Sequence, residues 1–287
     1  MHLRAAVIQL NSRNNPAENL ATVEHFLDRA TTMGAQFVSL PEFWIYLGPY
    51  SGFDEAAQTI PGPAIARLQE KARQHKMIVH GGSIVERSST IPGKFHNTSV
   101  LINRDGEIIA QYRKIHLFDV DLANGEKHYE SERIVPGDRV VTAEVDGITF
   151  GLTVCYDLRF PELYRSLALR GAQILMVPAG FTLHTGRDHW EVLLRARAIE
   201  NLCYVIAPAQ VGQYPPNRQC FGRSMVIDPW GLVLAQAQDM PTVIMTEIDL
   251  EQIDRARAQI PCLEHRKPQV YELSNRAVKP FASAIGI

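Results

Sequence analysis

Three ionisable residues stand where an apolar run of the sequence stops. Glu42 ends the run FVSLPE, Lys114 ends EIIAQYRK and Cys155 ends ITFGLTVC. Taken singly, they would be a solvated carboxylate, a surface lysine and a small core thiol. Functional side chains, however, collect at strand ends in α/β proteins, because the loops there converge on one crevice. The combination therefore indicates a shared site.

A thiol, a carboxylate and an ammonium group together supply the roles needed to attack an amide or nitrile carbon. The attacking species is a thiolate, because the neutral thiol is a poor nucleophile. Glu42 would accept the thiol proton and later activate water. Lys114 would favour the thiolate and stabilise the oxyanion of a tetrahedral intermediate, a contact worth roughly 3–4 kcal/mol. The backbone N–H of Tyr156 would be a second oxyanion donor, as in a nucleophile elbow.

Strands and helices alternate along the chain and would position these residues. Short apolar runs predict strands, among them RAAVIQL, FVSLPE, ILMVPAG, CYVIAPAQ and TVIMTEIDL. One helix is predicted from Pro16 to just before Gly34, another near 63–76, a third from Pro161, and a fourth with Asp188 as its N-cap. Cys155 would thus lie at an abrupt turn from a strand to a helix.

Two Asp-Gly pairs, at 105–106 and 146–147, stand between apolar runs and predict β-hairpins. The sequence contains no fixed-period repeat and no long linker. This pattern predicts an α/β fold in which sheets pack together with helices outside. We expect a single domain over residues 1–287, with an irregular tail from about residue 261.

Charge and composition exclude several classes of function. The formal net charge is −2 and no run of Lys and Arg reaches five residues, which argues against nucleic acid as a partner. The N-terminal apolar stretch is too short for a signal peptide, and no segment approaches the length of a membrane span. We therefore expect a cytoplasmic protein without a membrane partner. Its four cysteines, none in a CxxC pair, are expected to be free thiols.

Three segments, SLPEFW, YRKIHLFD and CYDLRFPELYR, resemble in order and spacing the signature motifs of the carbon–nitrogen hydrolase (nitrilase) superfamily. The resemblance covers nearly the whole chain. It implies a four-layer α-β-β-α sandwich and a homodimer or higher homo-oligomer formed through helices beside the active site. It also implies catalytic roles for Glu42, Lys114 and Cys155, with Glu130 orienting the lysine and the substrate. This chemistry needs no metal or organic cofactor.

Within that family, DHWEVLLRARAIENLCYVIAPAQVG, SMVIDPWG and CLEHRKPQVY look most similar to the deaminated glutathione amidases. Those enzymes hydrolyse the α-keto analogue of glutathione to 2-oxoglutarate and cysteinylglycine. The alternatives are an omega-amidase acting on 2-oxoglutaramate or 2-oxosuccinamate, a nitrilase, and an N-carbamoyl amino acid hydrolase. A non-catalytic interaction protein is an alternative from another class. The turn-rich stretch GQYPPNRQCFG would shape the pocket mouth and leaves the substrate size open.

Aromatic and charged residues near the catalytic positions are candidates for substrate binding. Phe43, Tyr46 and Tyr156 would wall the pocket and exclude water, with core packing as an equal alternative. An α-keto acid carboxylate would also require a positively charged partner, for which Arg159, Arg113 and a cluster of backbone N–H groups are all candidates.

Two histidine positions invite other interpretations. His189 is a candidate for substrate contact, and with His184 it would form a metal pair only if further ligands stood nearby at ligand spacing, which they do not. His116, two residues after Lys114, is an alternative general base. The family resemblance assigns that work to Glu42, so we expect His116 to have a structural hydrogen-bonding role.

Overall fold

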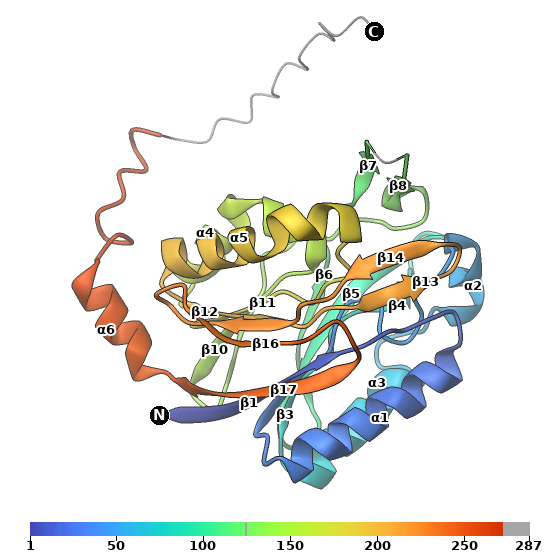
Figure 1. Cartoon of the computed structure of the whole chain (residues 1–287), viewed down its shortest axis with the longest axis horizontal. Coiled ribbons are helices and arrows are strands. Elements are labelled where there is room, and N and C mark those ends of the chain that lie inside the picture. The colour runs from blue at the N-terminus through green and yellow to red at the C-terminus, as the bar shows by residue number, and fades with distance from the viewer. Residues whose placement is uncertain (124, 272–287) are drawn as a thin grey trace, which may run out of the picture.

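Two β-sheets lie face to face between two layers of helices (Figure 1). The structure is a computed structural model and describes residues 1–123 and 125–271. The arrangement confirms the α-β-β-α sandwich that the sequence resemblance implied.

The first sheet runs in the order β17-β1-β2-β3-β5-β4, and β6 pairs with β5. Its strands are β1 (His2–Gln9), β2 (Phe37–Ser39), β3 (Ile78–His80), β4 (Ile84–Arg87), β5 (Phe95–Ile102), β6 (Ile108–Arg113) and β17 (Thr242–Asp249). Strands β1, β2 and β3 are parallel, while β5 and β6 form the hairpin predicted at Asp105-Gly106. The carboxyl end of β2 therefore leads directly to Glu42.

The second sheet runs in the order β16-β15-β12-β11-β10-β9. Its strands are β9 (Thr142–Val145), β10 (Ile148–Leu152), β11 (Ile174–Met176), β12 (Tyr204–Ala207), β15 (Met225–Ile227) and β16 (Val233–Gln236). Strands β9 and β10 form the second predicted hairpin, in which Asp146 and Gly147 both have positive φ, as a tight two-residue turn requires. Strands β10, β11 and β12 are parallel, so the residues that follow them meet at one edge.

Helices cover the outer face of each sheet (Figure 1). Helices α1 (Pro16–Thr32) and α3 (Pro63–His75) pack on the first sheet, and α4 (Pro161–Leu169) and α5 (Leu183–Asn201) pack on the second. The smaller helical elements are α2 (Phe53–Ala56), α6 (Glu251–Gln259) and the 3-10 turns η1 (Tyr50–Gly52), η2 (Glu130–Glu132) and η3 (Cys155–Arg159). Two short hairpins, β7 (Asp119–Asp121) with β8 (Lys127–Tyr129) and β13 (Val211–Tyr214) with β14 (Arg218–Phe221), stand outside the sheets.

The core explains why the chain forms these layers. Along β1, Val7 belongs to the cluster between the sheets, while its neighbour Ile8 belongs to the cluster beneath α1 and α3. A strand buried on both faces reads as a continuous apolar run because successive side chains point to opposite sides. Between the sheets, the rings of Phe37 and Phe150 stack with centroids 5.3 Å apart. The sheets are therefore held together by direct packing of their inner faces.

The structure adds one detail to the predicted elements and corrects another. The run MIVHGGSIVE, which follows the predicted helix near 63–76, forms the two strands β3 and β4, separated by the turn that contains Gly81 and Gly82. Helix α5 begins one and a half turns earlier than predicted, because the Thr182 hydroxyl accepts the backbone N–H of Thr185 and caps the helix there. Asp188 therefore lies inside α5 and is not its N-cap.

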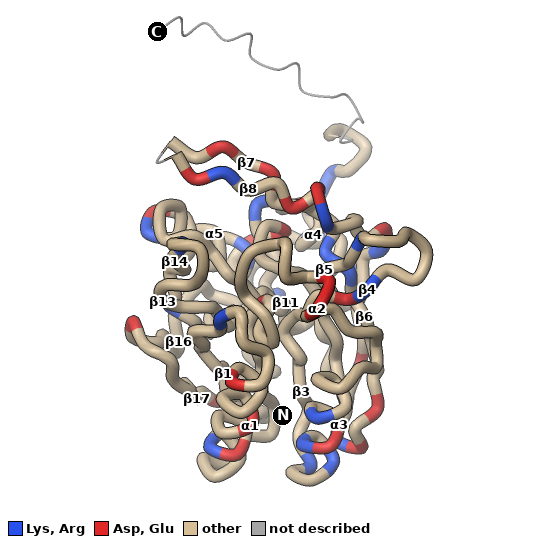
Figure 2. The backbone as a smooth tube through the Cα atoms, turned by 90° about the vertical axis from the view of Figure 1, so that its right-hand side faces the viewer, with Lys and Arg blue, Asp and Glu red and all other residues tan. Residues whose placement is uncertain are grey.

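Residues 261–271 contain no helix or strand, and the remainder of the predicted tail, 272–287, lies outside the described residues. That the chain forms a single domain stays a prediction. None of the helices within the described ranges is both long and apolar enough to span a membrane. On the side shown in Figure 2, basic and acidic residues are interspersed.

Candidate active site

The loop after β2 holds Glu42 in a tightly packed turn. Phe43 has a φ of 52°, an uncommon conformation for a bulky residue. The backbone N–H of Phe43 donates to Ser83 Oγ at 3.2 Å, and the N–H of Ser83 donates to the Pro41 carbonyl oxygen at 3.1 Å. At Gly82, a Cβ atom would lie 2.1 Å from that same carbonyl oxygen, so only glycine fits. The connection between β3 and β4 thus fixes the position of the carboxylate.

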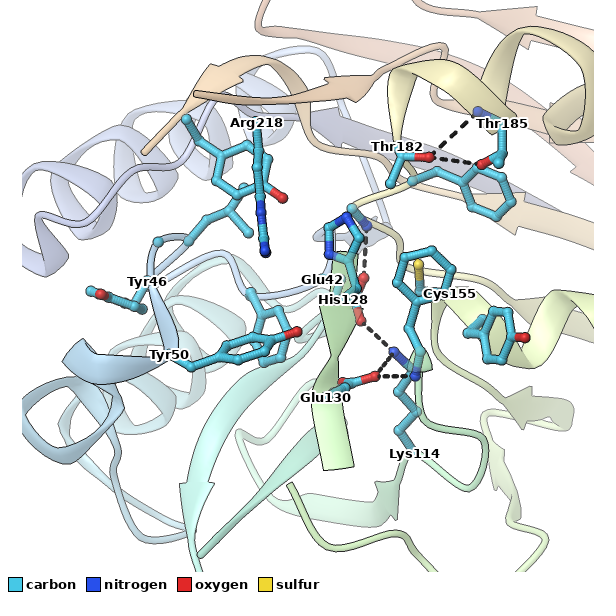
Figure 3. A pocket seen from close by; sticks show the side chains of 18 of the residues that line it. Glu42, Tyr46, Tyr50, Lys114, His128, Glu130, Cys155, Thr182, Thr185 and Arg218 are labelled. Carbon is cyan, nitrogen blue, oxygen red and sulfur yellow. Dashed lines mark hydrogen bonds and ion pairs between the residues drawn. The ribbon is translucent and has the colours of Figure 1, made fainter. Parts of the chain in front are cut away.

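Lys114 follows β6 and lies between two carboxylates (Figure 3). Its Nζ is 3.2 Å from Glu42 Oε1 and 2.8 Å from Glu130 Oε2. The Asn97 amide donates to both glutamates, at 2.8 Å to Glu42 and 3.2 Å to Glu130. Burial alone would lower the pKa of Lys114, but Glu130 and Glu42 raise it well above its usual value. The lysine is therefore an ammonium cation at neutral pH.

Cys155 stands at a sharp turn between β10 and α4. Its φ is 48°, and its backbone N–H donates to the Pro178 carbonyl oxygen at 2.9 Å. The turn is held by the buried carboxylate of Asp157, which accepts the Val154 backbone N–H at 2.8 Å and the Tyr112 hydroxyl at 2.6 Å. The sequence predicted this abrupt strand-to-helix turn, and the structure places Cys155 there at the end of the sheet, with its side chain buried.

The thiol of Cys155 does not have the thiolate character expected from the sequence. Burial, followed by the negative charge of Glu42, raises its pKa well above the usual value, and Lys114 opposes this only in part. The Glu42 carboxylate acts directly on the thiol, so a second anion beside it is unfavourable even with the Lys114 ammonium close by. The resting group is therefore a neutral thiol, and its attack on a substrate requires a base.

At neutral pH, the wild-type protein is expected to show no more ultraviolet thiolate absorbance than a Cys155→Ala variant. The raised pKa keeps the thiol protonated through the range where an ordinary cysteine ionises, so the thiolate forms only at higher pH. A pH titration of the absorbance difference measures this, because the other three cysteines are common to both proteins. A thiolate signal already present at neutral pH would mean that Lys114 lowers the pKa of the thiol by more than burial and Glu42 raise it.

Glu42, Lys114, Glu130 and Cys155 all line one pocket. Of the predicted substrate-binding residues, the structure places four in its wall and one outside it. The four that line the pocket are Phe43, Tyr46, Tyr156 and Arg159. His189 is outside the lining, but its Nδ1 lies 3.3 Å from Arg159 Nη1.

Two other candidates lie away from the pocket and have structural partners. The guanidinium of Arg113 pairs with Glu86, with Nη2 and Oε1 2.6 Å apart, so it does not face a substrate. His116 Nδ1 is 2.7 Å from Asp157 Oδ1, and its ring stacks on Phe160 at 3.6 Å between centroids. This agrees with the structural role expected for His116.

Several pocket residues were not singled out in the sequence. Most of them come from loops, 3-10 turns and the short hairpins outside the two sheets: Tyr50, Phe118, His128, Gly180, Thr182, Thr185, Tyr214 and Arg218. Gly180 follows β11, and its backbone N–H donates to Glu42 Oε2 at 2.8 Å. The parallel pairing of β10 with β11 is the signal that could have found it. For Tyr214 and Arg218, the only signal was the turn-rich stretch that contains them.

Comparisons with known proteins point to one family. A family model described as "Carbon-nitrogen hydrolase" matches residues 4–258. The chain is 42% identical over 265 residues to a deaminated glutathione amidase of Synechocystis sp., covering 91% of this chain and 97% of that protein. It is 37% identical over 270 residues to the human omega-amidase NIT2, covering 93% of this chain and 97% of that one.

Two solved structures resemble the fold closely. The NitFhit protein of C. elegans superposes with a TM-score of 0.87 at 36% identity, covering 94% of this chain and 66% of that one. An amidase from Nesterenkonia sp. AN1 superposes with a TM-score of 0.77 at 25% identity, covering 93% and 95%. That amidase, in a glutamate-to-glutamine mutant, carries the acetamide moiety of fluoroacetamide covalently added at its active-site cysteine.

Proposed function

The chain belongs to the carbon–nitrogen hydrolase family, and we propose that it hydrolyses deaminated glutathione through a thioester on Cys155. Membership makes it a hydrolase of carbon–nitrogen bonds other than peptide bonds, an amidase of the nitrilase superfamily. The observation that carries the proposal is that Cys155 shares one pocket with Glu42, Lys114 and Glu130. The covalent adduct on the cysteine of the Nesterenkonia amidase supports the choice of nucleophile, and the identity to the Synechocystis amidase supports the substrate.

In the first half of the reaction, the thiol becomes a thioester. The sulfur attacks the amide carbonyl carbon while its proton passes to Glu42, which the neutral state of the thiol makes necessary. The oxyanion that forms is stabilised by the Lys114 ammonium and by the Tyr156 backbone N–H. The carbon–nitrogen bond then breaks as Glu42 returns the proton to the departing nitrogen. Cysteinylglycine leaves, and the 2-oxoglutaryl group stays on the sulfur.

In the second half, water takes the place of the amine. Glu42 accepts a proton from the water as its oxygen attacks the thioester carbon, and Lys114 again faces the oxyanion. The carbon–sulfur bond breaks, the sulfur recovers its proton, and 2-oxoglutarate leaves. Glu130 accepts a hydrogen bond from Lys114, and the Asn97 amide donates to both Glu42 and Glu130, so these two residues hold the lysine and the base in position.

We also propose that the enzyme works as a homodimer or a higher homo-oligomer. Large apolar side chains are exposed on and near the helices beside the site, where a second subunit would cover them: Leu169, Val192, Ile199, Trp230 and Leu232. A cytoplasmic location stays a prediction from the sequence.

A substrate panel tests the proposed function. It contains deaminated glutathione, 2-oxoglutaramate, simple nitriles and N-carbamoyl amino acids, and we expect the highest kcat/KM with deaminated glutathione. A higher value with 2-oxoglutaramate would make the protein an omega-amidase. Release of ammonia from a nitrile or of carbon dioxide from an N-carbamoyl amino acid, at a higher kcat/KM, would favour the other enzymatic alternatives. No turnover of any of them would favour the non-catalytic alternative.

A further inference from the structure

Two arginines line the pocket without an acidic partner. Within the described residues, neither Arg159 nor Arg218 forms an ion pair with a carboxylate. Arg113 and Arg197, which lie outside the pocket, each pair with a glutamate. An arginine fork that faces a pocket and has no carboxylate of its own is suited to bind an anionic group of a ligand.

The two guanidinium groups belong to different walls of the pocket. Arg159 lies over the rings of Phe181 at 5.3 Å and Tyr156 at 5.8 Å, on the side built by η3 and the start of α5. Arg218 comes from the β13–β14 hairpin and reaches into the pocket above Tyr50, across from Cys155 (Figure 3). A ligand bound at Cys155 would therefore meet one cation on each side.

The position of Arg218 is fixed by a contact between two hairpins. Its Nη2 donates to the Lys127 carbonyl oxygen of β8 at 3.0 Å, although the two residues are 91 apart in sequence. One N–H is used in this way and another faces the Tyr214 hydroxyl, whereas a guanidinium has five N–H groups. The group is thus held at the pocket wall with further donors available to an oxygen ligand.

The surroundings of Arg218 leave its charge available to an anion. Burial raises the pKa of Tyr50 and of Tyr214, so both phenols stay neutral. Burial and the charge of Arg218 lower the pKa of His128, which is neutral as well. Glu126, which is not part of the pocket lining, is engaged with His128, with Oε2 and Nε2 3.4 Å apart.

We propose that Arg218 binds a carboxylate on the leaving-group side of the scissile amide. The site would then select amides whose amine portion ends in an acid, as a short peptide does. This inference rests on the proposed function, in which the departing cysteinylglycine carries a carboxylate of its own. Arg159 is then left for the carboxylate of the acyl portion, because the other candidate, Arg113, is paired with Glu86. A primary amide, which releases only ammonia, has no group that Arg218 could bind.

The test compares Arg218→Gln with the wild type on deaminated glutathione and on 2-oxoglutaramate. Both substrates form the same 2-oxoglutaryl thioester and differ only in the leaving group. For deaminated glutathione, kcat/KM is expected to fall about ten- to a hundred-fold, mainly through KM, since a charge-assisted contact made equally in ground and transition states is lost. For 2-oxoglutaramate, kcat/KM is expected to stay unchanged.

A modified substrate completes a double-mutant cycle, which isolates the contact between Arg218 and the terminal carboxylate of the substrate. With the terminal carboxylate of deaminated glutathione converted to a primary amide, the wild type should lose as much as Arg218→Gln does, and the variant should lose nothing more. Arg139→Gln, which removes the same charge from an exposed position, is the control and should match the wild type throughout.

The possible outcomes separate the two proposals. Equal losses on both substrates, or no loss on deaminated glutathione, would overturn the role of Arg218 while leaving the amidase function intact. A wild type that hydrolyses neither substrate would overturn the proposed function, and the Arg218 inference with it.

Discussion

Replacing Cys155 with alanine is expected to abolish hydrolysis of deaminated glutathione while the protein stays folded. The side chain lies at the end of β10 within the described pocket, and the proposed mechanism has no other group that can form the acyl intermediate. Loss of a nucleophile typically lowers kcat by roughly 10⁵-fold or more. Steady-state kinetics measure the loss, and thermal unfolding monitored by circular dichroism shows whether the variant is folded.

A second buried thiol serves as the matched control. Cys203 lies at the start of β12, where its sulfur is 3.1 Å from the Ala172 carbonyl oxygen, and it is not part of the pocket lining. Cys203→Ala should therefore lose some stability, as a buried substitution does, but keep its turnover per folded molecule. If Cys155→Ala retained the wild-type rate, the mechanism proposed here would be wrong.

The Glu42→Gln variant is expected to hydrolyse deaminated glutathione about 10²- to 10⁴-fold more slowly, the usual range for loss of a general acid–base group. The resting thiol is neutral, so acylation needs a base, and the same carboxylate is needed again to activate water. Glutamine keeps the shape of the side chain and an oxygen that can accept the Gly180 N–H. The loss should therefore reflect proton transfer rather than a collapsed site, and it is measured as kcat on folded protein.

Alkylation of Cys155 separates the two roles of Glu42, as the base of the reaction and as a negative charge beside the thiol. Removing the charge of Glu42 removes one of the causes that raise the thiol pKa, so a haloacetamide should still modify Cys155 in Glu42→Gln. Glu86→Gln is the control, because Glu86 is also a buried, ion-paired carboxylate but lies outside the pocket. Hydrolysis by Glu42→Gln within a few-fold of the wild-type rate would show that another group acts as the base.

The positions of Glu42, Lys114 and Cys155 could be predicted because each stands directly after an apolar strand. Strand ends are visible in a sequence as the point where an apolar run stops, and topology then brings such points together. The structure places all three side chains in one pocket. Their catalytic roles stay predictions that the variants above would test.

The opposite wall of the pocket could not be predicted in this way. Tyr50 belongs to a single 3-10 turn, and Arg218 to a hairpin whose contact with Lys127 joins residues 91 apart. Neither element is long enough for a pattern of apolar residues that would predict which part of the chain it packs against. The sequence also could not show that Cys155 is a neutral thiol, because burial and the distance to Glu42 exist only in the folded chain.

The burial of Cys220 is another feature that the neighbouring residues in the sequence do not predict. The residues before it in the sequence are polar and turn-rich, which suggests a surface loop, yet it lies in β14 and only 2% of it is exposed. In the fold, its main chain forms an isolated bridge with Thr182, and its side chain belongs to the hydrophobic cluster beneath α1 and α3.

The central claim is that an acyl group is carried on the sulfur of Cys155, and mass spectrometry tests it most directly. The wild type is quenched in acid during turnover of deaminated glutathione, with and without hydroxylamine, and the peptide that contains Cys155 is examined. We predict a 2-oxoglutaryl group on that residue, and diversion of product to the hydroxamate when hydroxylamine is present. Product formation with this peptide unmodified at every quench time, and with no hydroxamate, would contradict it.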